Sequence, residues 1–134
     1  MSQYLIDTNT CIAFLNQKNK SVVEKMSETK SSDIFLCRVI QAELYYGAYH
    51  SQKRESNLEK LENFFNEVNI LDFNDVVAQT YGQIRHDLAS VGTPIGSNDL
   101  FIAATALAHN VTLVTNNERE FSRIESLNIE NWFK

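Results

Sequence analysis

The stretch YLIDTNTCIAFL, residues 4–15, decides the fold. It opens with a short apolar run over residues 4–6, which ends at Asp7. Thr8 and Asn9 come next, and both residue types begin helices well. The apolar run CIAFL then continues as a helix. This stretch therefore predicts a buried strand, a turn and a helix, with an acid at the carboxyl end of the strand.

The rest of the chain repeats this alternation of short apolar runs and amphipathic segments. Further strands are predicted over residues 34–37, 70–73 and 111–114 and near residues 128–129. Helices are predicted over residues 18–30, 38–51, 55–69, 77–91 and 97–108 and around Phe121, the fourth of them stopping at Gly92. Strands separated by helices specify a parallel sheet covered on both faces. We expect a single α/β domain over residues 1–134, a three-layer α/β/α sandwich with a parallel four- to five-stranded sheet.

Composition excludes several classes of protein. The chain is 43% hydrophobic and 22% charged, with one Pro and four Gly, which is typical of a folded domain and not of a disordered one. No apolar run approaches the ~20 residues of a membrane span, and the first residues lack the basic stretch of a signal peptide. Cys11 and Cys37 have no zinc-site or disulfide-scaffold spacing. We expect a reduced, cytoplasmic protein.

Taken alone, the net charge of −5 argues against a protein that binds nucleic acid through an overall positive charge. The charge of carboxylates in a metal site must be counted separately, however, because bound cations offset it. If four acids bound cations, the rest of the chain would carry about −1. The placement of the acids therefore decides more than their number.

Two aspartates stand out, one at the end of a predicted strand and one in the first turn of a predicted helix. Asp7 ends the first predicted strand, and ligands of open α/β sheets bind at the carboxyl ends of strands. The same residue would also serve as an N-cap. Asp99 lies in the first turn of a helix that starts at Ser97, where the helix dipole favours an acid. Leu100 and its neighbours place that helix in the core, which disfavours a merely solvated Asp99.

Glu43 is the most informative of the acids. It lies on the helix face that carries Val39 and Ile40, which must look inward, and Gly47 leaves room one turn later. A carboxylate aimed at a core is costly unless it is paired or coordinates a cation. No basic residue stands beside Glu43. Metal binding is therefore favoured over the alternative, in which Glu43 lies at the boundary of the apolar face with its carboxylate in solvent.

The segment before the last helix offers a fourth acid. Glu118 and Glu120 are both candidates, with Asn116 and Asn117 as neutral ligands, although acids in the first turn of a surface helix are common. Three or four acids at strand ends suit a hard cation such as Mg²⁺, which takes oxygen ligands. The chain has no Gly-rich phosphate loop and no nucleophile elbow, so an enzyme built on it would use carboxylates and a metal.

These residues together resemble the PIN-domain family, and within it the VapC-type toxins of bacterial toxin–antitoxin pairs. The matching stretches are LIDTN at 5–9, QAELYYGA around Glu43, GTPIGSNDLFIAATALAHNVTLVTNN at 92–117, EREF at 118–121 and the tail IENWF. The resemblance implies a Mg²⁺-dependent ribonuclease, with Mn²⁺ as an alternative metal. It also implies a homodimer that assembles further with an inhibitory VapB-type antitoxin. Similar toxins cut tRNA, including initiator tRNA in its anticodon stem-loop.

Carried over by position, the resemblance makes Asp7, Glu43 and Asp99 catalytic, metal-binding acids. Many PIN domains have an Asp near the turn at residues 116–117, where this chain has Asn. We expect Glu120, the nearest acid of suitable type, to complete the metal site.

The substrate contacts follow from the same resemblance. Asn117 is expected to contact phosphate or metal-bound water, and Arg85, Arg119 and Arg123 are candidate phosphate contacts that could equally be solvated. The expected chemistry is hydrolysis of a phosphodiester by metal-activated water, which leaves a 5′-phosphate and a 3′-hydroxyl.

Two other classes stay open at this point. A receiver-type phosphoacceptor domain also has an Asp at a strand end, but it needs an adjacent acid pair that Asp7-Thr8-Asn9 does not supply. A non-catalytic RNA- or protein-binding module with a PIN-like fold is the second. The resemblance also implies a small antitoxin whose C-terminal segment wraps the apolar helices and offers a basic side chain to the acids. The tyrosines at 45, 46 and 49, which are expected to be exposed, support such a partner.

Overall fold

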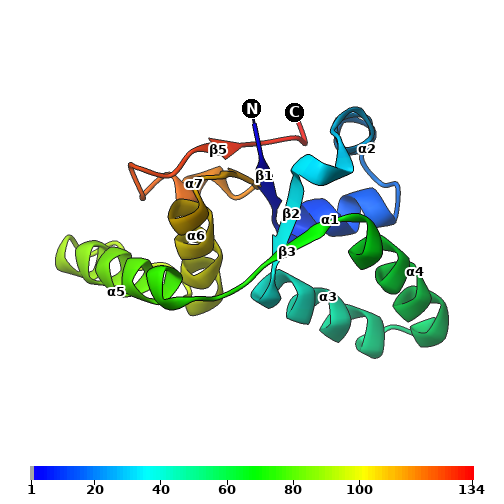
Figure 1. The fold of residues 1–134 in the computed structure, drawn as a ribbon, viewed down its shortest axis with the longest axis horizontal. Coiled ribbons are helices and arrows are strands. Elements are labelled where there is room, and N and C mark those ends of the chain that lie inside the picture. The colour runs from blue at the N-terminus through cyan, green and yellow to red at the C-terminus, as the bar shows by residue number, and fades with distance from the viewer. Residues whose placement is uncertain (1) are drawn as a thin grey trace.

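Five parallel strands in the order β3-β2-β1-β4-β5 form the centre of the molecule in a computed structural model that describes residues 2–134 (Figure 1). The strands are β1 (Tyr4–Ile6), β2 (Ile34–Cys37), β3 (Asn69–Leu71), β4 (Thr112–Val114) and β5 (Ile129–Glu130). The helices are α1 (Thr8–Leu15), α2 (Lys20–Glu28), α3 (Arg38–His50), α4 (Arg54–Glu67), α5 (Asp75–Ser90), α6 (Ser97–His109) and α7 (Glu118–Phe121), with a 3-10 turn over Ser31–Asp33. The expected fold class is confirmed.

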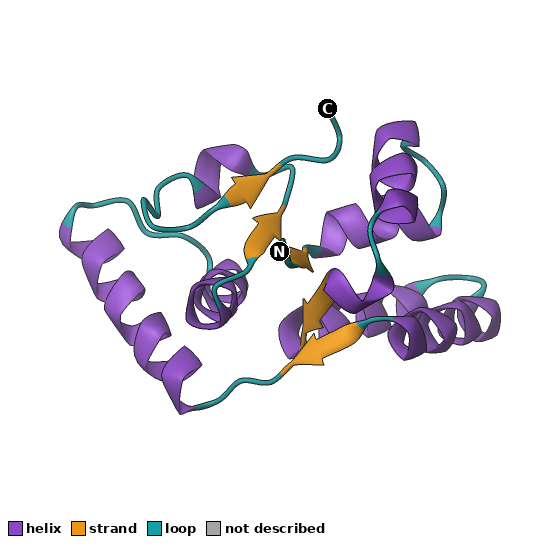
Figure 2. Ribbon diagram, turned by 45° about the horizontal axis from the view of Figure 1, so that its top comes forward, coloured by secondary structure: helices purple, strands orange, loops and turns teal. Residues whose placement is uncertain are grey.

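The helices form layers on the two sides of the sheet. Figures 1 and 2 show α5 and α6 on one side of the central strands and α1, α3 and α4 on the other. The central strands β1, β2 and β4 are therefore covered on both faces, and they are apolar apart from Thr112, the half-buried first residue of β4. Leu5, Ile6, Leu36, Leu113 and Val114 from these strands are fully buried.

The element boundaries agree with the sequence pattern except around the third strand. Gly92, with φ of +73°, follows α5 as expected of a residue that ends a helix. The helix predicted to reach Asn69 ends instead at Glu67, and Asn69 opens β3. The reason is that the Asn69 amide donates to the backbone carbonyls of Ser31, Ser32 and Ile34, which holds it beside the start of β2.

The strand order rules out the receiver-type alternative. Receiver domains share the flavodoxin-like order 2-1-3-4-5, in which the first strand lies between the second and third. Here β1 pairs with β2 and with β4. The chain moves outward from β1 on one side through β2 and β3, and on the other through β4 and β5. The carboxyl ends of β1 and β4 therefore flank the point where the order reverses, which is where such sheets bind ligands.

Two further properties match the expectations from composition. Cys11 and Cys37 are both free and buried, and burial raises the pKa of each thiol, so neither is a reactive thiolate. Within residues 2–134, no helix has the length and apolar character that crossing a membrane requires.

Candidate metal centre

Asp7 lies at the carboxyl end of β1 and begins α1. Its Oδ1 accepts the Thr10 backbone N–H at 2.9 Å, so it is the N-cap of that helix, and it is only 7% exposed. Burial raises the pKa of Asp7, and hydrogen bonds from Thr10 and Thr115 oppose that rise without cancelling it. Asp7 therefore has the position expected for both roles. It caps helix α1, and its carboxylate also lies at the carboxyl edge of the sheet.

Asp99 lies in the first turn of α6, which starts at the same edge of the sheet. Its side chain is half-buried. Desolvation, followed by the neighbouring carboxylates of Glu120, Glu43 and Asp7, raises the pKa of Asp99 to about 6. The fold thus brings the four acids that the sequence singled out into one electrostatic environment.

Glu120 approaches this group from α7. Its carboxylate accepts the Gly96 backbone N–H and the Asn117 side-chain amide, each at 3.3 Å. Although burial acts to raise the pKa of Glu120, these hydrogen bonds and the one from Asp99 hold it below its usual value. The contact between the two carboxyl groups thus acts to raise the pKa of Asp99 and to lower that of Glu120.

Glu43 does not point into the core, and that expectation was wrong. The buried face of α3 carries Ile40, Leu44 and Ala48, whereas Glu43 is half-buried beside it. Its Oε1 accepts the Thr8 hydroxyl at 2.7 Å. Because Thr8 opens α1, this bond turns Glu43 toward the carboxyl end of β1 and away from the apolar interior.

Sequence reasoning missed two hydroxyl groups that support the acids. Thr8 holds Glu43, and Thr115, fully buried directly after β4, acts to lower the pKa of Asp7. The Thr115 hydroxyl also accepts the Asn117 backbone N–H at 3.0 Å. A threonine immediately after a buried strand and two residues before an Asn was the available signal.

Glu118 is directed away from the other acids. Its carboxylate pairs with the Lys134 ammonium at 2.8 Å and accepts the Asn131 amide at 3.1 Å. These contacts lower the pKa of Glu118. Of the two acids in the last helix, the fold brings Glu120 and not Glu118 to the site.

The three candidate arginines are placed differently. Arg123 donates to the Pro94 carbonyl at 3.0 Å, and its charge lowers the pKa of Glu120, so it lies beside the acids. Arg85 donates to the Tyr81 hydroxyl at 3.2 Å on the exposed side of α5. Arg119 is exposed and makes no ion pair with any residue that the structure describes.

The donor set fits a hard divalent cation. Asp7, Glu43, Asp99 and Glu120 offer only oxygen atoms, and the ion pairs found within residues 2–134 involve none of them. In this part of the chain no group of three or more acidic, His or Cys side chains is placed to hold one metal ion together. Mg²⁺ does not need such a group, since it usually binds one or two carboxylates and keeps several waters.

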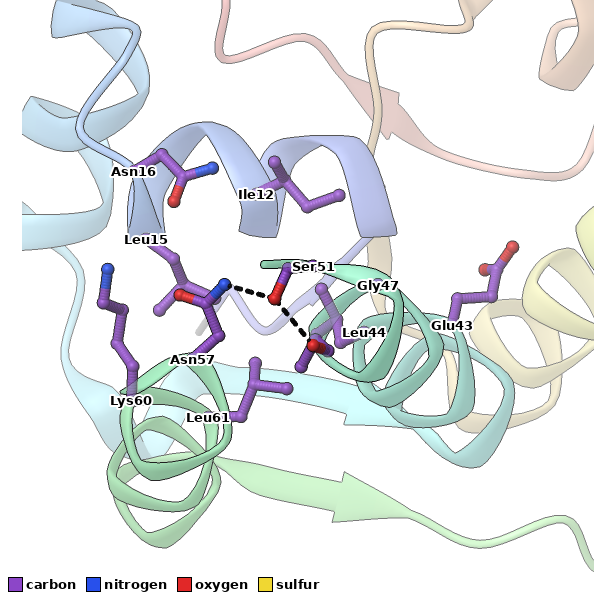
Figure 3. Close-up of a pocket in the computed structure, with 11 residues that line it drawn as sticks. Ile12, Leu15, Asn16, Glu43, Leu44, Gly47, Ser51, Asn57, Lys60 and Leu61 are labelled. Carbon is purple, nitrogen blue, oxygen red and sulfur yellow. Dashed lines mark hydrogen bonds between the residues drawn. The ribbon is translucent and has the colours of Figure 1, made fainter. Parts of the chain in front are cut away.

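An apolar groove begins beside Glu43 (Figure 3). It encloses about 240 Å³ between α1, α3 and α4. Ile12, Leu15, Leu44 and Leu61 supply its apolar lining. Figure 3 shows Glu43 at one end and Lys60 at the other, so the groove has charges of opposite sign at its ends.

The comparisons with known proteins agree along nearly the whole chain. A family model described as the PIN domain matches residues 4–127. The chain is 41% identical over 132 residues to Ribonuclease VapC2 of Rickettsia felis, which covers 98% of both chains. It is 38% identical to the tRNA(fMet)-specific endonuclease VapC of Shigella flexneri, over 98% of this chain and 99% of the relative. The solved structure of DNA-bound VapBC from Salmonella typhimurium matches with a TM-score of 0.91 at 38% identity, covering 98% of this chain and 99% of that one.

Proposed function

This chain belongs to the PIN-domain family, and from that membership we propose that it is a VapC-type endoribonuclease, the toxin of a toxin–antitoxin pair. The observation that carries the proposal is the convergence of Asp7, Glu43, Asp99 and Glu120 at the point where the strand order reverses. Within residues 2–134 none of these four carboxylates forms an ion pair, although Arg123 lies beside Glu120. The carboxylates therefore repel one another, and a divalent cation would relieve that repulsion.

The residues fit Mg²⁺, with Mn²⁺ as the alternative. Asp7 and Asp99 would hold the ion directly, and Glu43 and Glu120 would complete the site directly or through water. A bound ion of this kind supplies an acidified water and positive charge at the scissile phosphate. The chain itself orients the ligands, through its buried hydroxyl and amide hydrogen bonds, and we expect products with a 5′-phosphate and a 3′-hydroxyl.

Transfer RNA is the substrate that we propose, with the anticodon stem-loop of initiator tRNA as the first candidate. The support is the relative from Shigella flexneri, which is named for cleavage of tRNA(fMet). Asn117 and Arg123 lie beside Glu120 and would contact the RNA backbone. Arg85 and Arg119 lie further out on exposed helix faces and would contact it outside the cleavage site.

A VapB-type antitoxin is the proposed protein partner, as the VapBC complexes among the solved structures suggest. We assign the apolar groove between α1, α3 and α4 to a segment of that antitoxin. Its apolar side chains would fill the groove, and a basic side chain would reach Glu43 at the open end. We also propose a homodimer, which the antitoxin would link into larger assemblies.

Expression in cells tests the proposal. The wild-type chain should arrest growth, and RNA from the arrested cells should carry new 5′-phosphate ends at one tRNA position. An Asp7→Asn variant at equal abundance should do neither. Tight RNA binding without new ends from the wild-type protein would instead identify a non-catalytic RNA-binding module and reject the enzyme.

A further inference from the structure

The outer face of α3 presents an exposed aromatic ring next to the acids. Tyr46 is 69% exposed, although a large aromatic side chain usually buries most of its surface. Its ring stacks on the His50 imidazole, with centroids 5.5 Å apart and planes 13° apart. The imidazole lies over one face of the ring, and the 69% exposure of Tyr46 is consistent with an opposite face that is open to solvent.

Tyr46 shares a surface hollow with the metal centre. The hollow, of about 620 Å³, is lined by Tyr46 together with Thr8, Glu43 and Asn98. Along α3, Tyr46 lies three residues beyond Glu43, a rise of about 4.5 Å. A nucleotide next to a phosphate held at the acids therefore lies within reach of this ring.

The scarcity of positive charge at the site favours an RNA contact that does not depend on charge. The chain has a net charge of −5, and of the three candidate arginines only Arg123 lies beside the acids, with one of its nitrogens already bonded to Pro94. Electrostatic attraction, the usual source of RNA affinity, is correspondingly weak here. Stacking between a base and an aromatic ring supplies affinity without any positive charge.

We propose that Tyr46 is a stacking platform for the base of the nucleotide adjacent to the scissile phosphate. The proposal rests on the ribonuclease function proposed above. The free face of the ring receives the base, and the stack holds the backbone over the carboxylates. Because every base has a π-face, the platform selects unpaired nucleotides, such as those of a loop, without selecting sequence.

The other two tyrosines of α3 are unsuited to this role. Tyr45 packs edge-on against Phe65 and is half-buried, so the expectation that it is exposed was wrong. Tyr49 is 53% exposed, but the Arg54 guanidinium lies over its ring at 5.8 Å from the centroid. Tyr49 also does not line the hollow beside the acids. It is therefore a matched control on the same helix.

The test measures RNA binding in an Asp7→Asn background, in which cleavage cannot interfere. The probe is an anticodon stem-loop RNA with 2-aminopurine beside the scissile position. Tyr46→Ala should weaken binding about fivefold to 150-fold and abolish the stacking quench of the probe. Tyr46→Phe keeps the ring, and Tyr49→Ala spares the platform, so both should stay within about twofold. The thermal midpoint should not change in Tyr46→Ala, because the ring is exposed.

Two outcomes would overturn the platform. One is wild-type affinity and an unchanged quench in Tyr46→Ala. The other is a loss of antitoxin binding in Tyr46→Ala with RNA binding intact, which would assign Tyr46 to the partner surface. Failure of the wild-type protein to cleave RNA would reject the ribonuclease but not the binding result, so the two failures are distinguishable.

Discussion

At the scale of single residues, Asp7 has both a structural and a chemical role. A substitution such as alanine removes both at once, so its effect cannot be attributed to either role. The side-chain oxygen of Asp7 caps α1, and its charge belongs to the proposed metal centre. Asparagine caps helices as well as aspartate does, whereas alanine does not. The two roles can therefore be separated by comparing two substitutions at the same position.

Asp7→Asn should nearly abolish RNA cleavage and leave the free energy of unfolding unchanged or slightly higher. Asp7→Ala should lose the same activity and also about 1 kcal/mol of stability through the missing cap. Cleavage assays and urea unfolding of both variants provide the measurement. Substantial activity in Asp7→Asn would show that the charge is dispensable.

Glu120 and Glu118 form a second matched pair. Glu120→Gln removes a carboxylate beside Asp99 and should lower the cleavage rate by about a hundredfold, in the range seen when a metal ligand or its support is lost. Glu118→Gln breaks only the contacts to Lys134 and Asn131 and should change the rate little. If Glu118 proved the sensitive position, the assignment would fail. If neither were sensitive, Asn117 would be the residue to test.

Asp99 gives the metal-free protein a characteristic pH dependence. Its pKa in the folded chain, about 6, lies above the ordinary value of 3.8, so the folded state binds the proton more tightly than the unfolded state. The stabilisation from Asp99 is complete below the ordinary value and is lost as pH rises through the folded one. With chelator present, the free energy of unfolding should therefore fall from about pH 4 to pH 7.

Comparison with Asp99→Asn isolates this effect, because Glu120 has a pKa shifted in the opposite direction and partly offsets it. The wild-type minus variant difference in unfolding free energy should decrease as pH rises. Added Mg²⁺ should remove that decrease by displacing the proton. A difference that increased with pH would mean that Asp99 has a favourable ionised partner.

At the scale of the elements, α3 contains a glycine, Gly47, that no packing contact within the chain requires. A Cβ at Gly47 would meet no atom within 4 Å, yet glycine in a helix costs roughly 0.5–1 kcal/mol relative to alanine. Gly47 lines both the apolar groove and the hollow beside the acids. Close approach of the proposed antitoxin segment from outside would account for it.

Gly47→Ala should accordingly stabilise the free protein by roughly 0.5–1 kcal/mol and weaken antitoxin binding. Gly82→Ala in α5 is the control, since a Cβ there also meets nothing within 4 Å and Gly82 lines neither the groove nor the hollow. It should stabilise the protein equally without changing antitoxin affinity. Calorimetric binding and thermal unfolding measure both effects. Equal antitoxin affinity in the two variants would place the segment elsewhere.

The elements also show how far sequence reasoning reaches. Apolar runs and helical spacing predicted every strand and helix. The end of the first strand located Asp7, and the first turn of the buried helix located Asp99. The orientation of Glu43 was not predictable in this way, because it depends on how α1 packs against α3 and on the Thr8 hydroxyl. The burial of Tyr45 likewise depends on Phe65 of a different helix. The sequence pattern thus predicted the elements but not the side-chain contacts between them.

At the scale of the whole molecule, the strand order explains why acids distant in sequence meet. The reversal between β1 and β4 opens the carboxyl edge of the sheet there, and α3, α6 and α7 each bring one carboxylate to it. The sequence predicted a parallel sheet but not this order, which is decided by the packing of helices on its two faces. Metal binding, RNA stacking and antitoxin docking are thus assigned to one continuous region.

Cleavage of initiator tRNA by the purified protein, with and without chelator, tests the central claim most directly. We expect the wild-type protein to produce fragments with 5′-phosphate and 3′-hydroxyl ends in Mg²⁺, to lose this activity in excess chelator and to regain it when Mg²⁺ returns. Asp99→Asn should cleave under none of these conditions. Undiminished cleavage by the wild-type protein in excess chelator would contradict the metal-dependent account.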